Sequence, residues 1–335
     1  MTLQAPAKLA FLYGARETVW PGIVQSLLAE GGAVRAKLLE CDAVVRAKLG
    51  WSLEQMSHPD QRWQEHVLEP VLTSVQIALT EGWRALGVEP DVIGARCGGE
   101  FAAAHAAGRL SLEGALEVAC RLSRLVQEDR VGGGMFSLQM IVPEAEHLKR
   151  VSPVPFTIAA DNDDRTTVIA CGDEELDALQ AFLTSRRLPF QKLGLKIAYH
   201  HPAVDGWAPM FCGPSETRRP DPSALPLYSA TAQGLLGDMA DDGRHFWRVI
   251  REPALVGPMA RAMLGDGYRT FLEVGGFPSL AGMIGEEGRG ASGEVHTLAS
   301  MRRGESFGAV STEARSVLAE LGGCGPVSSA RTPDG

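Results

Sequence analysis

The nine residues Val92–Glu100, VIGARCGGE, decide the fold of this chain. The apolar start of this stretch predicts a short buried strand, and the alanine-rich run 98–107 predicts a helix. Between them lies a tight strand-turn-helix elbow, in which small flanking residues let the backbone fold sharply around a nucleophile. A serine stands at the tip of many such turns, and here the residue is Cys97.

The chemistry expected at Cys97 follows from its place in front of a helix. The free amide groups and the positive dipole end of that helix are expected to lower the pKa of the thiol and to favour thiolate. The backbone N–H of Gly98 is placed to donate to an oxyanion. A nucleophile also needs a base, and His200 in the segment AYHH, 198–201, is the best candidate among eight histidines.

Bulk composition excludes several classes of protein. The chain has 335 residues and a formal net charge of −9. An acidic chain without a basic block binds nucleic acid poorly, and no apolar run is long enough to span a bilayer, so neither partner is expected. The six cysteines lie far apart, and no Cys/His cluster has the spacing of a metal site, so no metal is expected. A reduced, cytoplasmic setting fits this cysteine usage.

Strand and helix patterns alternate along the chain and predict an α/β fold. We expect an α/β-hydrolase-like core with a parallel sheet, formed by residues 1–131 and 197–320. Residues 132–196 are β-rich, with the βαββαβ character of a ferredoxin-like unit, and predict an inserted small subdomain. Residues 321–335 are rich in Gly, Ser and Pro and predict a flexible tail.

From Pro90 to Ser123 the sequence resembles the malonyl-CoA:acyl carrier protein transacylases and the acyltransferase domains of polyketide synthases. Their pattern is roughly VxGHSxGE, then an alanine-rich helix and AGxLSLEDA, and this chain has VIGARCGGE and AGRLSLE. Aligned without gaps, Cys97 occupies the position of the nucleophilic serine. The segment AYHH is similar to the family's AFHS, which puts His200 at the catalytic base. The resemblance extends over residues 8 to 285.

The resemblance implies transfer of an acyl group to an acyl carrier protein from an acyl-CoA or acyl-carrier donor. No bound cofactor is implied, since the substrates carry phosphopantetheine themselves. Arg16 aligns with the glutamine of the family's FPGQG loop, so its backbone N–H is expected to join that of Gly98 in the oxyanion hole. The family orients its histidine with a backbone carbonyl, and the corresponding position here is Val249.

The sequence departs from the family where malonyl groups are recognised. The family's LRSR reads RLSR at 121–124, so the arginine that pairs with a free carboxylate becomes Leu122. Arg121 is one residue away, and about 100° around a helix, so it should point elsewhere. A leucine in the pocket favours an acyl group without a terminal carboxylate, because a buried carboxylate would lack its partner.

Other residues are assigned to the pocket from the same alignment. The histidine of the family's GHS aligns with Arg96, and Ile197 and Tyr199 directly precede His200. The two new arginines, Arg16 and Arg96, leave open that a carboxylate, a phenolate or a phosphopantetheine group binds there in a new way.

A cysteine nucleophile without that arginine resembles the starter-unit acyl carrier protein transacylase domains of fungal non-reducing polyketide synthases. The sequence therefore predicts a discrete acyltransferase that moves a non-carboxylated, starter-type acyl group through a Cys97 thioester. Two alternatives remain open. One is an acyl-thioester hydrolase on the same fold, with water as the acceptor, and the other is a non-catalytic partner that docks carrier proteins.

Overall fold

The main sheet of the protein has six strands, in the order β11-β10-β1-β2-β7-β8. A computed structural model describes residues 8–56, 58, 63–129, 131–211, 224–237 and 243–322. All neighbouring strands of this sheet are parallel except the last pair, β7 and β8. The strands are β1 (Leu9–Tyr13), β2 (Val92–Ala95), β7 (Leu227–Ser229), β8 (Gly234–Leu235), β10 (Thr270–Glu273) and β11 (His296–Ala299).

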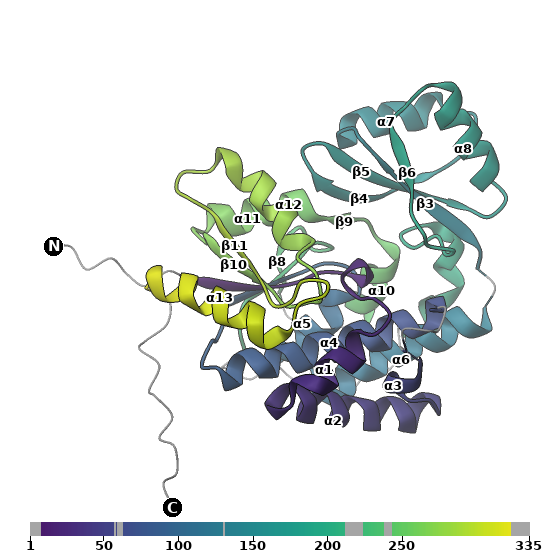
Figure 1. Cartoon of the computed structure of the whole chain (residues 1–335). Coiled ribbons are helices and arrows are strands. Elements are labelled where there is room, and N and C mark those ends of the chain that lie inside the picture. Colours follow the sequence, from purple (N-terminus) through teal and green to yellow (C-terminus); the bar gives the residue numbers. More distant parts are fainter. Residues whose placement is uncertain are drawn as a thin grey trace, which may run out of the picture.

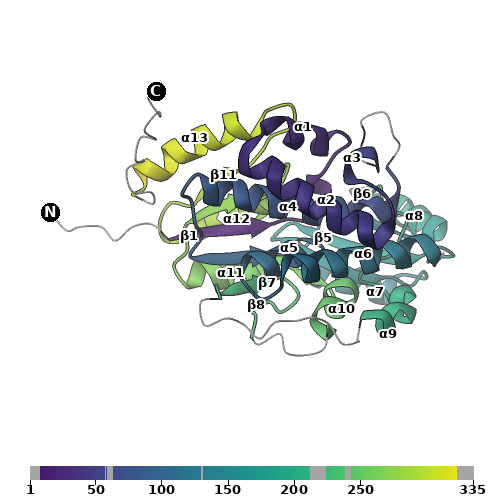
Figure 2. The same ribbon diagram turned by 90° about the horizontal axis from the view of Figure 1, so that it is seen from below.

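Helices cover both faces of this sheet (Figure 1). On one side lie α1 (Ile23–Glu30), α2 (Gly32–Leu49), α4 (Glu65–Ala85), α5 (Gly99–Ala106) and α6 (Leu112–Glu128), and Figure 2 shows this layer from below. On the other side lie α11 (Val256–Gly265) and α12 (Leu280–Glu287). The remaining helices are α3 (Leu53–Met56), α9 (Ala208–Phe211), α10 (Arg244–Arg251), α13 (Phe307–Glu320) and the short 3₁₀ turns η1 (Arg16–Thr18), η2 (Pro202–Trp207) and η3 (Gly288–Gly290).

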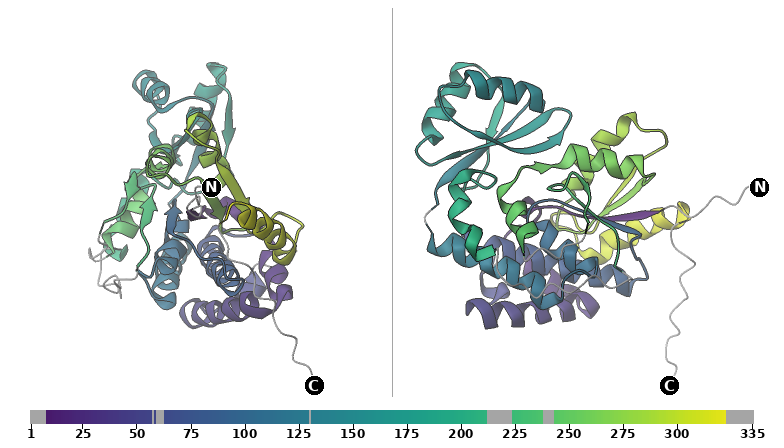
Figure 3. Two further views of the ribbon diagram at one scale, coloured as in Figure 1. Left: turned by 90° about the vertical axis from the view of Figure 1, so that its left-hand side faces the viewer. Right: turned by 180° about the vertical axis from the view of Figure 1, so that it is seen from behind.

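A second sheet forms a separate lobe above the main sheet, as Figure 3 shows from two sides. Its strand order is β6-β3-β5-β4-β9, and two helices cover it. The lobe has its own hydrophobic cluster, which includes Phe136, Ile169 and Leu183. Its elements are β3 (Gly133–Leu138), α7 (Val142–Val151), β4 (Thr157–Asp163), β5 (Thr166–Gly172), α8 (Leu176–Ser185), β6 (Phe190–Lys192) and β9 (Ala254–Leu255).

The predicted α/β fold with a mainly parallel core sheet is confirmed. Residues 132–196 contribute β-α-β-β-α-β in that order, but the fifth strand, β9, comes from outside this segment and pairs in parallel with β4. The predicted tail lies outside the described residues beyond Gly322. Across the described ranges, no helix combines the length and apolar character needed to cross a membrane.

The elbow between β2 and α5 is packed directly against the end of β1. A Cβ atom at Gly99 would lie 2.3 Å from the carbonyl oxygen of Gly14 and 2.4 Å from that of Tyr13. Only a residue without a side chain permits this approach, which brings the elbow beside the segment that follows β1. A further carboxyl group, that of Glu273 at the end of β10, lies at the same edge of the sheet, where a Cβ at Gly14 would meet its Oε1 at 2.4 Å.

Glu273 is almost completely buried, with 1% of its surface exposed. The N–H of Ala281 donates to its Oε2 at 2.7 Å, and Oε1 has no hydrogen-bond partner among the described residues. Burial raises the pKa of this carboxyl from 4.5 to about 8, against the opposing effect of the backbone donors of α12. Glu273 therefore carries a proton over much of the range in which an ordinary glutamate is ionised.

Gly99→Ala is expected to lower the free energy of unfolding by about 2 kcal/mol or more, because the added methyl group meets two backbone oxygens that cannot move away independently. Urea unfolding followed by circular dichroism measures this. The matched control is Gly282→Ala in α12, where a Cβ meets nothing within 4 Å. It should stay within about 1 kcal/mol of the parent, on the stabilising side. Equal effects of the two substitutions would contradict the packing argument.

Glu273→Gln is expected to flatten the dependence of stability on pH. The folded chain holds the Glu273 proton more tightly than the unfolded chain, so this group's contribution is fully present below about pH 4.5 and is lost as the pH rises through about 8. Glutamine keeps the acceptor for the Ala281 N–H but cannot ionise. Between pH 5 and 8 the parent should lose on the order of 1 kcal/mol per pH unit more than the variant. If the urea midpoints of the parent and of Glu273→Gln change equally with pH across this range, the assignment of a buried proton to Glu273 is wrong.

Candidate active site

A cavity of about 230 Å³ lies between the carboxyl edge of the main sheet and the second lobe. Cys97 and His200 both line it, so the structure brings the predicted nucleophile and the predicted base into one space. The second lobe supplies a mostly apolar wall, which includes Met135, Val168 and Leu195. The wall on the core side also carries the charged side chains of Arg16, Glu17 and Arg96.

Cys97 stands at the tip of the elbow in a strained backbone conformation. Its φ angle is 48°, which a residue with a side chain rarely adopts, and such strain is typical of functional turns. The N–H of Gly98 faces the sulfur. Burial raises the pKa of the thiol to about 11; the Glu69 carboxylate also raises it, and Arg16, Arg96 and the Gly98 N–H lower it. The predicted shift toward thiolate is therefore wrong, and the resting sulfur is a neutral thiol.

His200 is held on both sides by backbone groups. Its Nδ1–H donates to the carbonyl oxygen of Glu252 at 2.5 Å, which leaves Nε2 without a proton and able to accept one. Its backbone N–H donates to the carbonyl of Ile250 at 2.9 Å. The hydroxyl of Thr157, in β4, donates to the His200 carbonyl at 3.1 Å. Burial lowers the pKa of the imidazole to about 4, so His200 is a neutral base at physiological pH.

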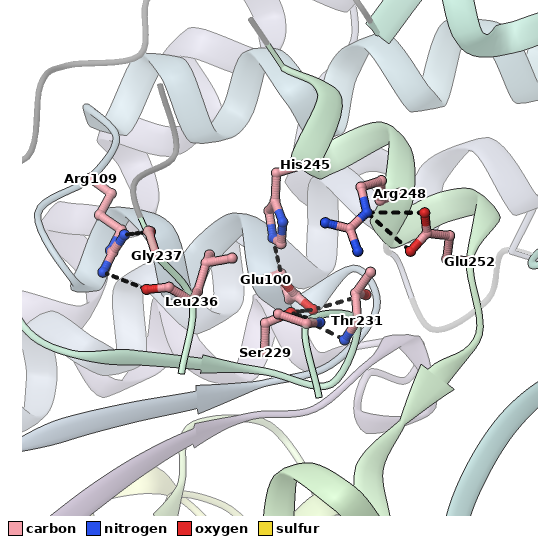
Figure 4. A network of polar contacts seen from close by, with 10 residues as sticks. Glu100, Arg109, Ser229, Thr231, Leu236, Gly237, His245, Arg248 and Glu252 are labelled. Carbon is pink, nitrogen blue, oxygen red and sulfur yellow. Dashed lines mark hydrogen bonds and ion pairs between the residues drawn. The ribbon is translucent and has the colours of Figure 1, made fainter. Parts of the chain in front are cut away.

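The carbonyl that orients His200 belongs to Glu252, so the prediction of Val249 is wrong. Val249 lies inside α10, which ends at Arg251. Glu252 is the first residue after the helix and has extended backbone angles, so its carbonyl leaves the helical direction and points to the imidazole. The Glu252 side chain is held in turn by the Nε of Arg248, at 3.0 Å from each carboxylate oxygen (Figure 4).

The two arginines of the site are already paired with carboxylates of the chain. Arg16 donates from Nη1 to Glu65 Oε2 at 3.0 Å and from Nη2 to Glu69 Oε1 at 2.6 Å. Its guanidinium also lies 4.2 Å from the ring centre of Tyr199. Arg96 pairs with Glu17; burial alone would raise the pKa of this carboxyl, but the charge of Arg96 and the hydrogen bonds to Glu17 together lower it.

Two predicted pocket residues lie elsewhere. Leu122 and Ile197 are buried in the main hydrophobic cluster and do not line the cavity, whereas Arg96 and Tyr199 do. The structure thus corrects these two assignments, because both side chains fill the core. The Arg121 side chain donates to the carbonyl of Met210 at 3.0 Å, away from the cavity, as its helical position requires.

Glu100, in the first turn of α5, connects the elbow to two other segments (Figure 4). Its Oε1 accepts from the hydroxyl of Ser229 at 2.8 Å and from Thr231, and its Oε2 contacts His245 Nε2 at 2.7 Å. His245 belongs to α10, the helix that leads to Glu252. A buried carboxylate therefore fixes α5 relative to α10, the helix that leads to Glu252.

Glu69 is the site residue that sequence reasoning missed. It is 2% exposed, on the helix whose apolar face packs on the core. A charged residue on such a face is rarely buried without a partner. A glutamate among the apolar residues of this helix was therefore the sequence feature that could have indicated a site. Within the described residues, no group of three or more His, Cys, Asp or Glu side chains is arranged to hold a metal ion.

Comparison with known proteins agrees with this architecture. The family model described as "Acyl transferase domain" matches residues 10–324. The erythronolide synthase EryA2 of Saccharopolyspora erythraea is 29% identical over 306 residues, which cover 90% of this chain but 9% of that protein. The chain thus spans less than a tenth of the length of this relative.

Solved structures share the fold across nearly the whole chain. The acyltransferase domain of SpnD, in complex with 2-(pent-4-yn-1-yl)malonyl, superposes with a TM-score of 0.85 at 25% identity, covering 95% of this chain and 78% of that one. A loading acyltransferase from the avermectin modular polyketide synthase superposes with a TM-score of 0.81 at 24% identity, covering 92% and 99%. Cys97 at the elbow and an oriented histidine line one cavity, and the family model matches almost all of the sequence, so the chain belongs to the acyl transferase domain family.

Proposed function

We propose that this acyltransferase moves a non-carboxylated, starter-type acyl group through a Cys97 thioester. The donor is a CoA or carrier-protein thioester, and the acceptor is the phosphopantetheine thiol of an acyl carrier protein. The family needs no bound cofactor, since its substrates bring the phosphopantetheine arm with them. Cys97 is the nucleophile, His200 the base, and the N–H groups of Gly98 and Arg16 the oxyanion donors.

The charge pattern of the cavity is the observation that carries this proposal. A carboxylated acyl group needs an unpaired cation, preferably a guanidinium. Among the residues that line the cavity, Arg16 and Arg96 are the arginines, and each is paired with carboxylates of the chain. The wall from the second lobe is mainly apolar. A terminal carboxylate would therefore be desolvated without compensation, whereas an alkyl chain would be buried favourably.

The reaction follows from the protonation states of the two catalytic groups. As the Cys97 sulfur attacks the thioester carbonyl carbon, its proton passes to Nε2 of His200, and the carbonyl electrons move onto the oxygen. The oxyanion is stabilised by the two backbone N–H groups until the bond to the leaving sulfur breaks. The leaving thiolate takes the proton from Nε2. In the second half, the acceptor thiol gives its proton to Nε2 and attacks the Cys97 thioester, and the Cys97 sulfur leaves and takes the proton back. In each half, one thioester bond breaks and one forms.

Intact-mass analysis after mixing the protein with acetyl-, hexanoyl- and malonyl-CoA tests the acyl class. We expect adducts of the monocarboxylic groups, formed at least about tenfold faster than malonyl, since one unpaired buried charge is worth more than 1.4 kcal/mol. Cys97→Ala should remove the adduct. Preferential malonyl labelling would contradict the charge argument, and labelling of Cys97→Ala would contradict the attachment site.

The pH dependence of single-turnover acylation tests whether the Cys97 thiol and the His200 imidazole are both neutral before the reaction. With the pKa of His200 near 4 and that of Cys97 near 11, both groups are in the reactive form throughout the range between, so the rate should be level from pH 6 to 9. His200→Ala should slow acylation by about 10²- to 10⁴-fold. If the rate falls as the pH is lowered, with a midpoint near 6.5, the pKa of His200 is that of an ordinary histidine. That result would overturn the assignment of a lowered pKa to His200.

Transfer and hydrolysis differ only in the acceptor, and one assay separates them. The acyl-loaded protein is incubated with and without a phosphopantetheinylated acyl carrier protein, and acyl-carrier and free acid are quantified. Transfer predicts that acyl-carrier formation exceeds free-acid release by about tenfold or more, because the buried site excludes water. Dominant free acid would favour the hydrolase. A Cys97→Ala variant with full activity in the pathway would favour the carrier-docking partner.

A further inference from the structure

Glu69 joins the two backbone segments that flank the nucleophile. Its Oε1 accepts from Arg16 Nη2 at 2.6 Å, and Arg16 follows β1. Its Oε2 faces the elbow, where a Cβ atom at Gly98 would lie 2.0 Å from this oxygen. The absence of a side chain at Gly98 is what lets the carboxylate come so close. Oε2 is buried and has no hydrogen-bond partner among the described residues.

The charges of this cluster do not cancel. Arg16 carries one positive charge and contacts two carboxylates, those of Glu65 and Glu69, so the three side chains together carry −1. Glu65 has a partner for each oxygen, since Oε2 accepts from Arg16 and Oε1 accepts from the Lys196 N–H at 3.3 Å. Burial raises the pKa of Glu69, and the ion pair with Arg16 opposes that rise. When the cluster is ionised, the uncompensated negative charge lies on Glu69 Oε2, the oxygen that faces the elbow.

We propose that Glu69 is a positioning residue whose carboxylate holds the Cys97 thiol in its protonated resting form and fixes Arg16 at the cavity wall. This inference rests on the proposed role of Cys97 as the acyl carrier. A nearby negative charge opposes formation of a thiolate, so the sulfur becomes nucleophilic only when His200 takes its proton during attack. Between turnovers the thiol is then inert toward electrophiles and oxidants that react with thiolates.

Each of the other charged groups around the sulfur affects the thiol less than Glu69 does. Arg96 is neutralised by Glu17, and Arg16 is shared between Glu65 and Glu69. His200 is neutral because burial lowers its pKa to about 4, and burial raises the pKa of Tyr199 so that its phenol keeps its proton. Glu69 is the largest charge effect on the thiol after burial itself. The groups that face Cys97 or Glu69 are Arg16, Glu17, Glu65, Arg96, Tyr199 and His200.

The test is the pH profile of Cys97 alkylation by iodoacetamide, read from the mass of the Cys97 peptide in the full-length protein between pH 6 and 10. In the parent, the midpoint should lie above the ordinary thiol value of about 8.5. In Glu69→Gln, which keeps the shape but removes the charge, the midpoint should fall by about one unit, so that alkylation at pH 7.5 becomes about tenfold faster.

Glu65→Gln is the matched control. Glu65 also lies in α4 and also pairs with Arg16, so the substitution removes an equivalent charge. The Glu65 carboxylate does not face Gly98, so the alkylation midpoint should shift by less than about half the shift in Glu69→Gln. Equal shifts in the two variants, or no downward shift in Glu69→Gln, overturn the proposal. Circular dichroism and thermal melting establish that each variant is folded.

Two measurements keep the proposal testable if Glu69→Gln does not fold. A parent midpoint at or below about 8.5 overturns it without any variant. Glu69→Ala removes the same charge without burying an amide group and should also show a lowered midpoint, so an unshifted midpoint also overturns it. Because alkylation uses no acyl substrate, these results stay readable even if acyl loading occurs elsewhere, and failure of the proposed function is thereby distinguished from failure of this inference.

Discussion

The close approach of Gly99 to the carbonyl oxygens of Tyr13 and Gly14 is the constraint on which the site depends. It allows β2 to turn into α5 directly against the end of β1, so the sulfur of Cys97 and the segment of Arg16 line the same cavity. Parallel strands end at one edge of a sheet, and this edge is where such folds bind ligands. A methyl group at this one position would push the elbow away from the end of β1 and the segment of Arg16.

The electrostatics of the site are set by burial more than by the helix dipole. The thiol and the imidazole are both neutral, because burial raises the pKa of the first and lowers that of the second. The arginines that line the cavity are committed to internal carboxylates. The wall from the second lobe is mainly apolar, which suits the proposed binding of an acyl chain.

Sequence reasoning placed the elbow, the α/β fold and the pairing of Cys97 with His200 in one cavity, because these follow from local patterns and from motif order. It failed where the answer depends on three-dimensional detail. The choice between Val249 and Glu252 is a matter of where a helix ends, which sequence fixes only to within a few residues. The ionisation of the thiol was predicted wrongly because its burial, the largest cause of the raised pKa, arises only on folding, as does its closeness to Glu69, which comes from a helix distant in sequence.

Strand β4 connects the second lobe to His200 and to the segment that follows Glu252. Thr157 holds the His200 carbonyl, and Ala160 pairs with Ala254, two residues after the Glu252 carbonyl that orients the ring. A shift of the second lobe relative to the main sheet would therefore also shift His200, because both connections are short. The position of the imidazole is thus tied to the position of the second lobe.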